Sequence, residues 1–153
     1  MANIRIDTLR SDFSKEDVAE INGLLRELSS NVKPVGADDI SSVVQGGILF
    51  VAREEEANEM EKIVGIASLI PYTKLSGTVA RVEDVVVAET HRGQGIGKKL
   101  MEAALSYKWT EGAKVPAMIE LTSNPSRIAA NKLYQSLGFE KYDTNVYRRS
   151  IRD

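Results

Sequence analysis

Ten residues near the middle of the chain, His91 to Leu100, combine regularly spaced glycines with positive charge. They read HRGQGIGKKL, with glycine at positions 93, 95 and 97 beside Arg92, Lys98 and Lys99. Glycine permits positive φ and leaves backbone N–H groups accessible because it has no Cβ. A helical pattern follows, and the start of a helix carries unpaired N–H groups and partial positive charge. The stretch predicts an anion site, most often for phosphate; the alternative is a turn whose glycines serve packing alone.

Two familiar phosphate-binding motifs do not fit this stretch. A Walker A motif requires glycine five positions before Gly97 and serine or threonine after Lys98, but Arg92 and Lys99 stand there. A dinucleotide-binding fingerprint requires glycine at position 98, and too few residues follow to complete a doubly wound sheet. Neither nucleotide-binding fold is expected.

The composition excludes several kinds of site. The 153 residues are sufficient for one hydrophobic core, so we expect a single domain over 1–153. With no cysteine and one histidine, the chain offers no disulfide, no thiolate or multi-histidine metal site and no cysteine nucleophile. A net charge of −2 argues against a nucleic-acid partner. No apolar run reaches membrane-spanning length and no signal peptide is apparent, so we expect a cytoplasmic protein without a membrane partner.

The first half of the chain predicts one strand, two helices and three further strands. A strand is expected at 3–9, and Ser14 and Asp17 have capping-box spacing before an amphipathic helix over 18–28. A second helix should end at glycines 46 and 47. Strand-like segments follow at 48–54, 62–73 and 78–89, and the connectors EEANEME and KLSG favour an antiparallel meander.

The second half predicts a strand-to-helix turn, a helix, a buried strand and another helix. The first helix follows the glycine turn, and AMIELTS at 117–123 is typical of a buried strand. Asn124 should cap the last helix with Pro125 at its first position, and Gly138 suits a left-handed C-terminal cap. A final strand is expected near TNVYRRSI, at 144–151. The predicted class is α/β (α+β), with a mixed, mostly antiparallel sheet of six to seven strands and about four helices.

Two segments of the chain resemble signatures of the GNAT superfamily of N-acetyltransferases. EDVVVAETHRGQGIGKKLMEAAL is similar to its strand, loop and Q/R-x-x-G-x-G/A helix start, with Arg92, Gly95 and Gly97 at the motif positions. NPSRIAANKLYQSLGFEKY resembles the second signature, N…A…LY-x-x-x-GF. Both occur in order and are separated by one strand. The chain is therefore identified as a member, with the acyl-CoA N-acyltransferase (GNAT) fold.

The resemblance implies acetyl-CoA as the co-substrate. Its pyrophosphate would bind backbone N–H groups from Arg92 to Lys98, and the strand through Val85 and Val87 would part from its neighbour at 117–123. The amide-rich pantetheine arm would then pair with the exposed main chain. For Asn124 and Asn131, a helix cap and a solvent-facing side chain are the alternatives. The cofactor-binding residues that the resemblance implies are Val85, Val86, Val87, Arg92, Gly93, Gln94, Gly95, Ile96, Gly97, Lys98, Asn124, Arg127 and Asn131.

Acetyl transfer to an amine requires a general base. A lysine-like amine has a pKa of about 10.4, so its deprotonation at pH 7 costs roughly 4–5 kcal/mol. Glu83 is the candidate, acting directly or through water. In a regular strand Glu83 shares a face with Val85 and Val87, while Asp84 points to the opposite face. The alternative is a structural ion pair between Glu83 and a neighbouring arginine.

The departing thiolate benefits from a proton donor. The resemblance gives this role to Tyr134, which occupies the tyrosine position of LYQSLGF. The alternative is a core aromatic, because Leu133 and Leu137 lie beside it. His91 is interpreted as structural. Since no cysteine can carry the acetyl group, attack should be direct within a ternary complex.

The expected function is N-acetylation of a primary amine, with a small-molecule acceptor favoured. The alternatives are a protein lysine or N-terminal acceptor, and a non-catalytic acyl-CoA-binding regulatory module. Tyr134 together with a carboxylate on the strand argues against the module. Asp38, Asp39 and Glu83 are either solvated charges or attract a cationic acceptor. A homodimer is a further expectation, because dimers are common among such domains.

Overall fold

The fold, seen in a computed structural model that describes residues 3–56 and 60–152, comprises two compact units. The first, Met1–Leu121, contains the whole β-sheet, and the second, Thr122–Asp153, contains the last helix. A single domain over 1–153 stays a prediction. In chain order the elements are β1 (Ile4–Leu9), α1 (Lys15–Leu28), α2 (Ala37–Gly46), β2 (Ile48–Glu55), β3 (Glu61–Lys74), β4 (Gly77–Val87), the short 3₁₀ helix η1 (Glu89–His91), α3 (Ile96–Leu105), β5 (Met118–Glu120) and α4 (Ile128–Ser136).

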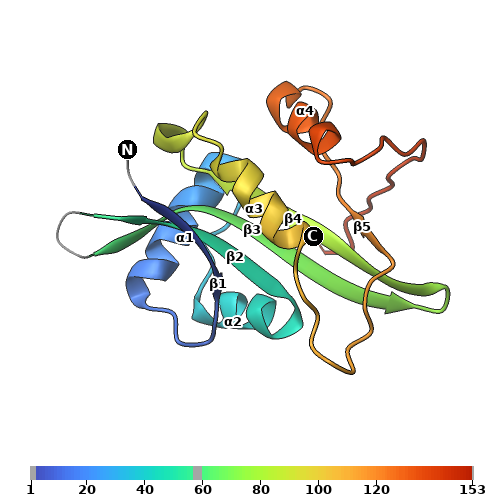
Figure 1. Ribbon diagram of the computed structural model, residues 1–153, viewed down its shortest axis with the longest axis horizontal. Coiled ribbons are helices and arrows are strands. Elements are labelled where there is room, and N and C mark those ends of the chain that lie inside the picture. The colour runs from blue at the N-terminus through green and yellow to red at the C-terminus, as the bar shows by residue number, and fades with distance from the viewer. Residues whose placement is uncertain (1–2, 57–59, 153) are drawn as a thin grey trace. The chain divides into compact units, whose positions relative to one another are not determined.

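The sheet has its five described strands in the order β1-β2-β3-β4-β5, so neighbours in the chain are neighbours in space (Figure 1). The first three pairings are antiparallel and the pairing of β4 with β5 is parallel. The predicted mixed, mostly antiparallel sheet and the meander of three central strands are confirmed. The connector expected at 55–61 falls partly on residues 57–59, which lie outside the described residues.

Two strand predictions in the second half need correction. The buried strand expected at 117–123 is reduced to Met118–Glu120, and Met118 is exposed. The final strand expected at 144–151 is absent: residues 140–152 are exposed and form no described helix or strand. Alternating apolar and polar residues favour a strand, but a strand forms only where its backbone finds a ladder partner. The described sheet therefore has five strands instead of six to seven.

Helices cover both faces of the sheet in the first unit. α1 and α2 pack on one face over the central strands, and α3 packs on the other. Gly65 of β3 permits the close approach of α3, because a Cβ at this position would lie 3.1 Å from Leu100 and 3.3 Å from Ile96. The buried core residues of the face under α1 and α2 are Leu9, Ile21, Leu24, Leu25, Ile40, Leu49, Val51, Ile63, Ile66 and Val86.

The predicted capping box fixes the start of α1 and ties it to the sheet. The Asp17 N–H donates to Ser14 Oγ at 3.1 Å, and the Ser14 N–H donates to Asp17 Oδ2 at 2.9 Å. Arg53 of β2 donates to the other carboxylate oxygen, Asp17 Oδ1, at 2.9 Å. Burial alone would raise the pKa of Asp17, but the hydrogen bonds from Arg53 and Ser14 outweigh it and lower the pKa.

Asp17→Asn should destabilise the chain by about 1–3 kcal/mol at pH 7, because it removes a charged hydrogen bond at a largely buried site. Since the pKa of Asp17 is lowered in the folded state, the carboxylate stabilises the fold above its ordinary pKa of 3.8. This stabilisation is lost as the pH falls below 3.8 through the lowered value. Urea unfolding of both proteins between pH 7 and pH 3 measures the difference.

Asp7→Asn is the matched control, because Asp7 pairs with Arg5 at 2.9 Å where both side chains are well exposed. It should change the free energy of unfolding by under about 1 kcal/mol. An Asp17→Asn deficit that stays constant down to pH 3 would contradict the role given to this carboxylate.

Candidate active site

The glycine turn between η1 and α3 has the backbone conformation that its sequence predicts. Gly93 and Gly95 both have a φ of +77°, in the left-handed region that favours glycine. Gly95 is the N-cap of α3 and supplies no side-chain cap, and its carbonyl accepts the first helical hydrogen bond from Lys99 at 3.1 Å. Residues 92–95 are exposed, so a ligand can reach the turn.

A run of successive backbone N–H groups at this turn lacks a partner. Within the described part of the chain, none of the six N–H groups from residue 93 to residue 98 donates a hydrogen bond to the protein. Consecutive N–H groups in alternating left-handed and right-handed conformations form an anion-binding concavity, and the dipole of α3 adds partial positive charge. The turn fits a pyrophosphate on this observation. These donors belong to Gly93, Gln94, Gly95, Ile96, Gly97 and Lys98.

Arg92 differs from the expectation, because both its main chain and its side chain are bonded within the protein. Its N–H donates to the Glu89 carbonyl at 3.3 Å, so it is not among the free donors. Its guanidinium donates to the Val87 carbonyl at 3.0 Å and to Glu27 of α1 at 3.3 Å. Glu27 also accepts the Glu89 N–H at 2.8 Å. Arg92 therefore braces the turn against the end of β4 and against α1.

Beyond the first residues of β4, one edge of the strand has no neighbour among the described strands. The pairing with β5 extends only from Val79–Met118 to Arg81–Glu120. The Ala88 N–H donates to the Val64 carbonyl of β3 at 2.8 Å. Successive residues of a strand direct their main-chain N–H and C=O groups to opposite edges. The main chain of Val87 and the carbonyl of Val85 therefore face away from β3. Arg92 occupies the Val87 carbonyl, which leaves the Val85 carbonyl and the Val87 N–H for a ligand.

Val86 differs from its two neighbours on this strand. Its side chain is buried in the core, and its main chain faces β3. Of the three valines expected at the cofactor, Val85 and Val87 therefore remain candidates and Val86 offers no free group.

A β-bulge at Asp84 overturns the predicted face of Glu83. Between the pairs Ser68–Glu83 and Ile66–Val86, β4 has one more residue than β3, and Asp84 takes a φ of +52°. Paired residues share a face, so Glu83 lies on the face of Val86 and of α1, opposite to Val85 and Val87. The prediction assumed strict alternation, which a single extra residue reverses.

Glu83 is held by Arg81, a neighbouring arginine as the ion-pair alternative required. Arg81 Nε donates to Glu83 Oε1 at 3.0 Å, and this bond raises the pKa of Arg81. Arg81 also lies 3.6 Å from Glu120, which accepts a 2.7 Å hydrogen bond from the Tyr72 hydroxyl. The ion-pair alternative for Glu83 is thus realised, yet Glu83 is 45% exposed and its Oε2 has no partner in the described chain. The i, i+2 spacing of Arg81 and Glu83 was the available signal.

In the second unit, α4 supports Tyr134 through its C-terminal cap. The Phe139 N–H donates to the Tyr134 carbonyl and the Gly138 N–H to the Gln135 carbonyl, the two bonds of a Schellman motif. The Phe139 ring folds back onto α4 and meets the Tyr134 ring edge-on, with the ring centroids 6.1 Å apart. Gly138 has the predicted positive φ.

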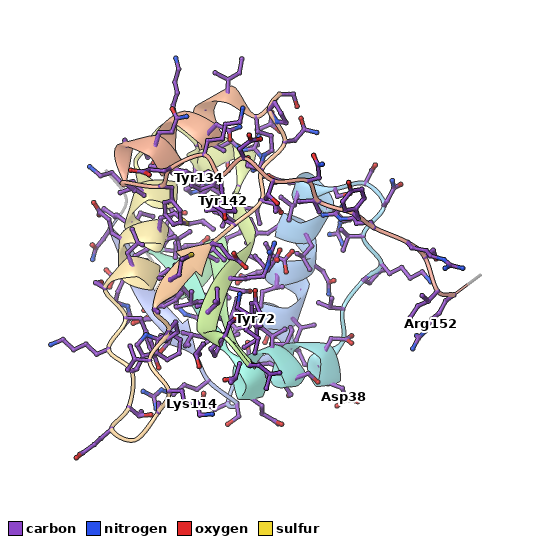
Figure 2. The ribbon with its side chains drawn as sticks, turned by 90° about the vertical axis from the view of Figure 1, so that its right-hand side faces the viewer. Asp38, Tyr72, Lys114, Tyr134, Tyr142 and Arg152 are labelled. Carbon is purple, nitrogen blue, oxygen red and sulfur yellow. The ribbon has the colours of Figure 1, made fainter. Side chains whose placement is uncertain are left out.

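Tyr134, labelled in Figure 2, is the buried residue of α4. Tyr134 is 6% exposed, and its hydroxyl makes no hydrogen bond within the described residues. Burial raises the pKa of Tyr134, which the charge of Arg127 partly opposes. A raised pKa keeps the phenol protonated at neutral pH, as a proton donor must be.

The residues before α4 form a turn instead of the predicted cap. α4 begins at Ile128 with Arg127 as its N-cap, so Asn124 does not cap the helix. The Asn124 side chain instead accepts hydrogen bonds from Ser126, which favours a local turn over helix. Asn131 donates to the carbonyls of Asn124 and Arg127 at 2.9 and 2.8 Å instead of facing solvent. The Arg127 guanidinium has no ion pair in the described chain.

His91 has the structural role that was predicted for it. Its ring lies between Glu54 of β2 and Thr90, with 2.8 Å contacts to both. These bonds fix η1 against the sheet just before the glycine turn.

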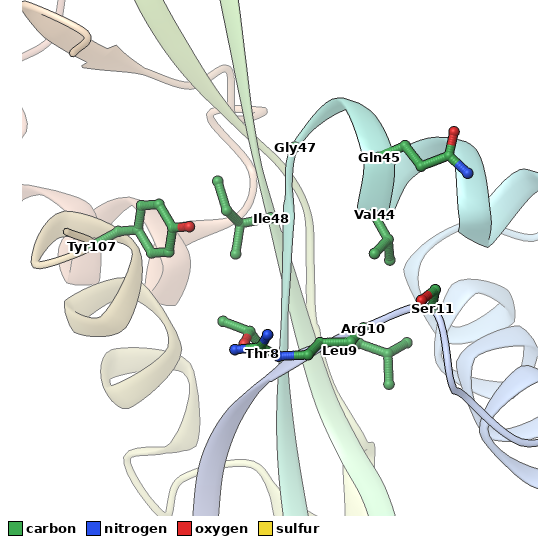
Figure 3. Close-up of a pocket in the computed structure, with 9 residues that line it drawn as sticks. All are labelled: Thr8, Leu9, Arg10, Ser11, Val44, Gln45, Gly47, Ile48 and Tyr107. Atoms are coloured by element: carbon green, nitrogen blue, oxygen red, sulfur yellow. The ribbon is translucent and has the colours of Figure 1, made fainter. Parts of the chain in front are cut away.

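A pocket of about 390 Å³ lies elsewhere in the first unit (Figure 3). Tyr107 and Ile48 lie on one side of it, Val44 and Gln45 on the other. No residue of the glycine turn and no candidate catalytic residue lines it. It is therefore not the predicted site.

The family to which this chain belongs follows from its match to a protein-family model. A model of the acetyltransferase (GNAT) domain matches residues 45–141, a range that includes the glycine turn, Glu83 and Tyr134. The chain belongs to the GNAT family. The resemblance identified from the two signatures is thereby confirmed.

A curated protein is similar to part of the chain. Human N-acetyltransferase 8B is 32% identical over 98 residues, which is 63% of this chain and 40% of that protein. The match thus spans less than half of the relative's length.

Several solved structures share the fold of this chain over nearly its whole length. An aminoglycoside N-acetyltransferase in complex with CoA has a TM-score of 0.75 at 18% identity, covering 99% of this chain and 97% of that one. An acetyltransferase of Trypanosoma brucei has a TM-score of 0.72 at 22% identity, covering 97% and 100%. Glucosamine-6-phosphate N-acetyltransferase of Arabidopsis thaliana has a TM-score of 0.68 at 20% identity, covering 96% and 98%. The expected GNAT fold is confirmed.

None of the helices described in residues 3–56 and 60–152 has the length and apolar character needed to cross a membrane.

Proposed function

We propose that this chain transfers an acetyl group from acetyl-CoA to a primary amine of a small molecule, by direct attack in a ternary complex. The observation that carries the proposal is the run of unpaired N–H donors at the start of α3, next to the open edge of β4. The turn offers main-chain donors to a diphosphate. The strand edge offers the Val85 carbonyl and the Val87 N–H to a ligand rich in amides.

The chain's own residues divide the remaining tasks. Acetyl-CoA, when bound, supplies a thioester carbonyl that accepts the amine and a sulfur that leaves as the thiol. Glu83, whose Oε2 is unpaired, accepts the proton of the amine nitrogen directly or through water. Tyr134, kept protonated by burial, donates a proton to the leaving sulfur. One proton is thus removed at nitrogen and one is supplied at sulfur.

Names of related proteins support a small-molecule acceptor. The structural relatives include aminoglycoside acetyltransferases, one of them solved with sisomicin, and a glucosamine-6-phosphate N-acetyltransferase. Since their sequence identities are low, the site residues of this chain carry the argument. The two catalytic candidates also favour an enzyme over a module that only binds acyl-CoA.

A panel of amines tests the proposal. The full chain is mixed with acetyl-CoA and small-molecule amines, a lysine peptide or a peptide with a free N-terminus. Free thiol is measured, and acceptor mass is followed for the gain of one acetyl group. We expect turnover with small amines and a much lower kcat for Glu83→Gln. CoA binding without turnover on any amine would favour the non-catalytic module, and turnover on peptides alone would favour a protein acceptor.

A further inference from the structure

One buried hydroxyl on the sheet face under α1 and α2 has no hydrogen-bond partner among the described residues. Ser68 of β3 is 4% exposed, and its neighbours on this face, Leu49 and Ile66, belong to the core. Its hydroxyl makes no hydrogen bond within the described chain. The Ser68 hydroxyl keeps some contact with solvent. Among the described residues, the one unbonded side-chain oxygen or nitrogen that is fully enclosed is Ser123 Oγ, and Ser68 Oγ is therefore not fully enclosed. A nearly buried hydroxyl that has no protein partner and is still reachable can bond a ligand, and Ser68 offers such a group.

The bulge at Asp84 brings the candidate base beside this hydroxyl. Ser68 and Glu83 are paired across β3 and β4, so both face α1. The Cβ atoms of directly paired residues lie about 4.5–5.5 Å apart. An ammonium group between them would meet the Ser68 hydroxyl and the free oxygen of Glu83 at once.

A second carboxylate lies further along the same face. Glu120 is paired in register with Arg81, which is two residues from Glu83 and therefore about 7 Å away along the strand. Tyr72, which is labelled in Figure 2, lies on the hairpin of β3 and β4, and its hydroxyl donates to Glu120 Oε1 at 2.7 Å. Glu83 and Glu120 are 45% and 40% exposed, so both are accessible to a ligand.

The charges of this group favour a cation over an anion. Arg81 is the single positive group between the two carboxylates, and it already contacts both of them. Among the described residues of this group, a carboxylate of an amino-acid acceptor would find no cation that is not already paired. A second ammonium group would find a partner, because the two carboxylates outnumber the guanidinium.

We propose that Ser68 and Glu83 bind the reacting amine while Glu120, held by Tyr72, binds a second ammonium group of the same molecule. The acceptor is therefore a compact diamine or an amino sugar with two amines roughly 7–8 Å apart, because Glu120 lies two residues along from Glu83 and one strand across. This inference rests on the proposed acetyltransferase function and narrows its acceptor. Ser68 and Glu120 become specificity-determining residues of the acceptor site.

Calorimetric titration of the full chain, with and without CoA, tests the site directly. The ligands are butane-1,4-diamine and butylamine, which differ only in the second amine. Glu120→Gln should weaken the diamine roughly tenfold or more, as expected for the loss of a charged hydrogen bond, and leave butylamine within about twofold. Ser68→Ala should weaken both. Glu111→Gln, at an exposed carboxylate outside the site, should change neither.

Steady-state kinetics provides the second readout. In Glu120→Gln, KM for butane-1,4-diamine should rise while kcat is retained, because Glu120 binds the remote amine. The diamine site is wrong if Glu120→Gln weakens the two amines equally, or if wild-type protein binds CoA and treats both amines alike. The assignment of Ser68 is wrong if Ser68→Ala binds both normally. Diamine binding that depends on Glu120 in a chain that binds no CoA would instead uphold this site and overturn the acetyltransferase proposal.

Discussion

Valine in place of Gly95 should lower the affinity for CoA by roughly 10- to 100-fold. A side chain at this N-cap would stand over the N–H groups of the turn and keep a diphosphate from approaching them. The loss of a single hydrogen bond to a charged group corresponds to about 1.5–3 kcal/mol, which is at least tenfold in affinity. Equilibrium titration with CoA measures the change.

Gly112→Val separates this effect from backbone strain. Gly95 and Gly112 have nearly the same φ, +77° and +81°, and a Cβ at either position meets nothing within 4 Å. Both variants should therefore lose similar stability, about 1–2 kcal/mol or somewhat more for a β-branched residue. Only Gly95→Val should lose CoA. Equal affinities in the two variants would refute the placement of the pyrophosphate.

Tyr134→Phe should lower kcat by about 100-fold while leaving CoA affinity nearly unchanged. The substitution removes only a hydroxyl that has no hydrogen bond in the described chain, so α4 should keep its fold. Single-turnover measurements of thiol release with saturating amine measure the step directly.

Tyr142→Phe is the control, because Tyr142 is 84% exposed and should tolerate the change at full rate. Since burial raises the pKa of Tyr134 above its ordinary value of 10, deprotonation of this group should not lower kcat below pH 10. A wild-type rate in Tyr134→Phe would mean that water or another group protonates the thiol.

Local signals in the sequence were sufficient where one short segment decides its own structure. The box of Ser14 and Asp17 and the positive φ at Gly95 and Gly138 all depend on a few neighbouring residues. The glycine turn was predictable for the same reason, because its donors come from consecutive residues. The family signatures then located Tyr134 by position alone.

Features that depend on partners distant in the chain escaped prediction. The bulge at Asp84 arises from the register of β4 against β3. No residue in this segment is of a type that predicts a bulge. The bulge moved Glu83 to the other face. Arg81, Glu120 and Tyr72 come together from three strands, so their contacts follow from sheet order, which the sequence pattern leaves open. Asn124 failed as a cap because Ser126 competes for its side chain.

The brace formed by Arg92 has a consequence for the ligand as a whole. One guanidinium joins the last carbonyl of β4 to the glycine turn and to α1. The position of the turn relative to the edge of β4 is therefore fixed before a ligand binds. A long, flexible ligand that binds both the turn and the edge of β4 would then have its two contact points held at a fixed separation. The reactive end arrives at the same residue in each binding event, with little ordering of the protein left to be done.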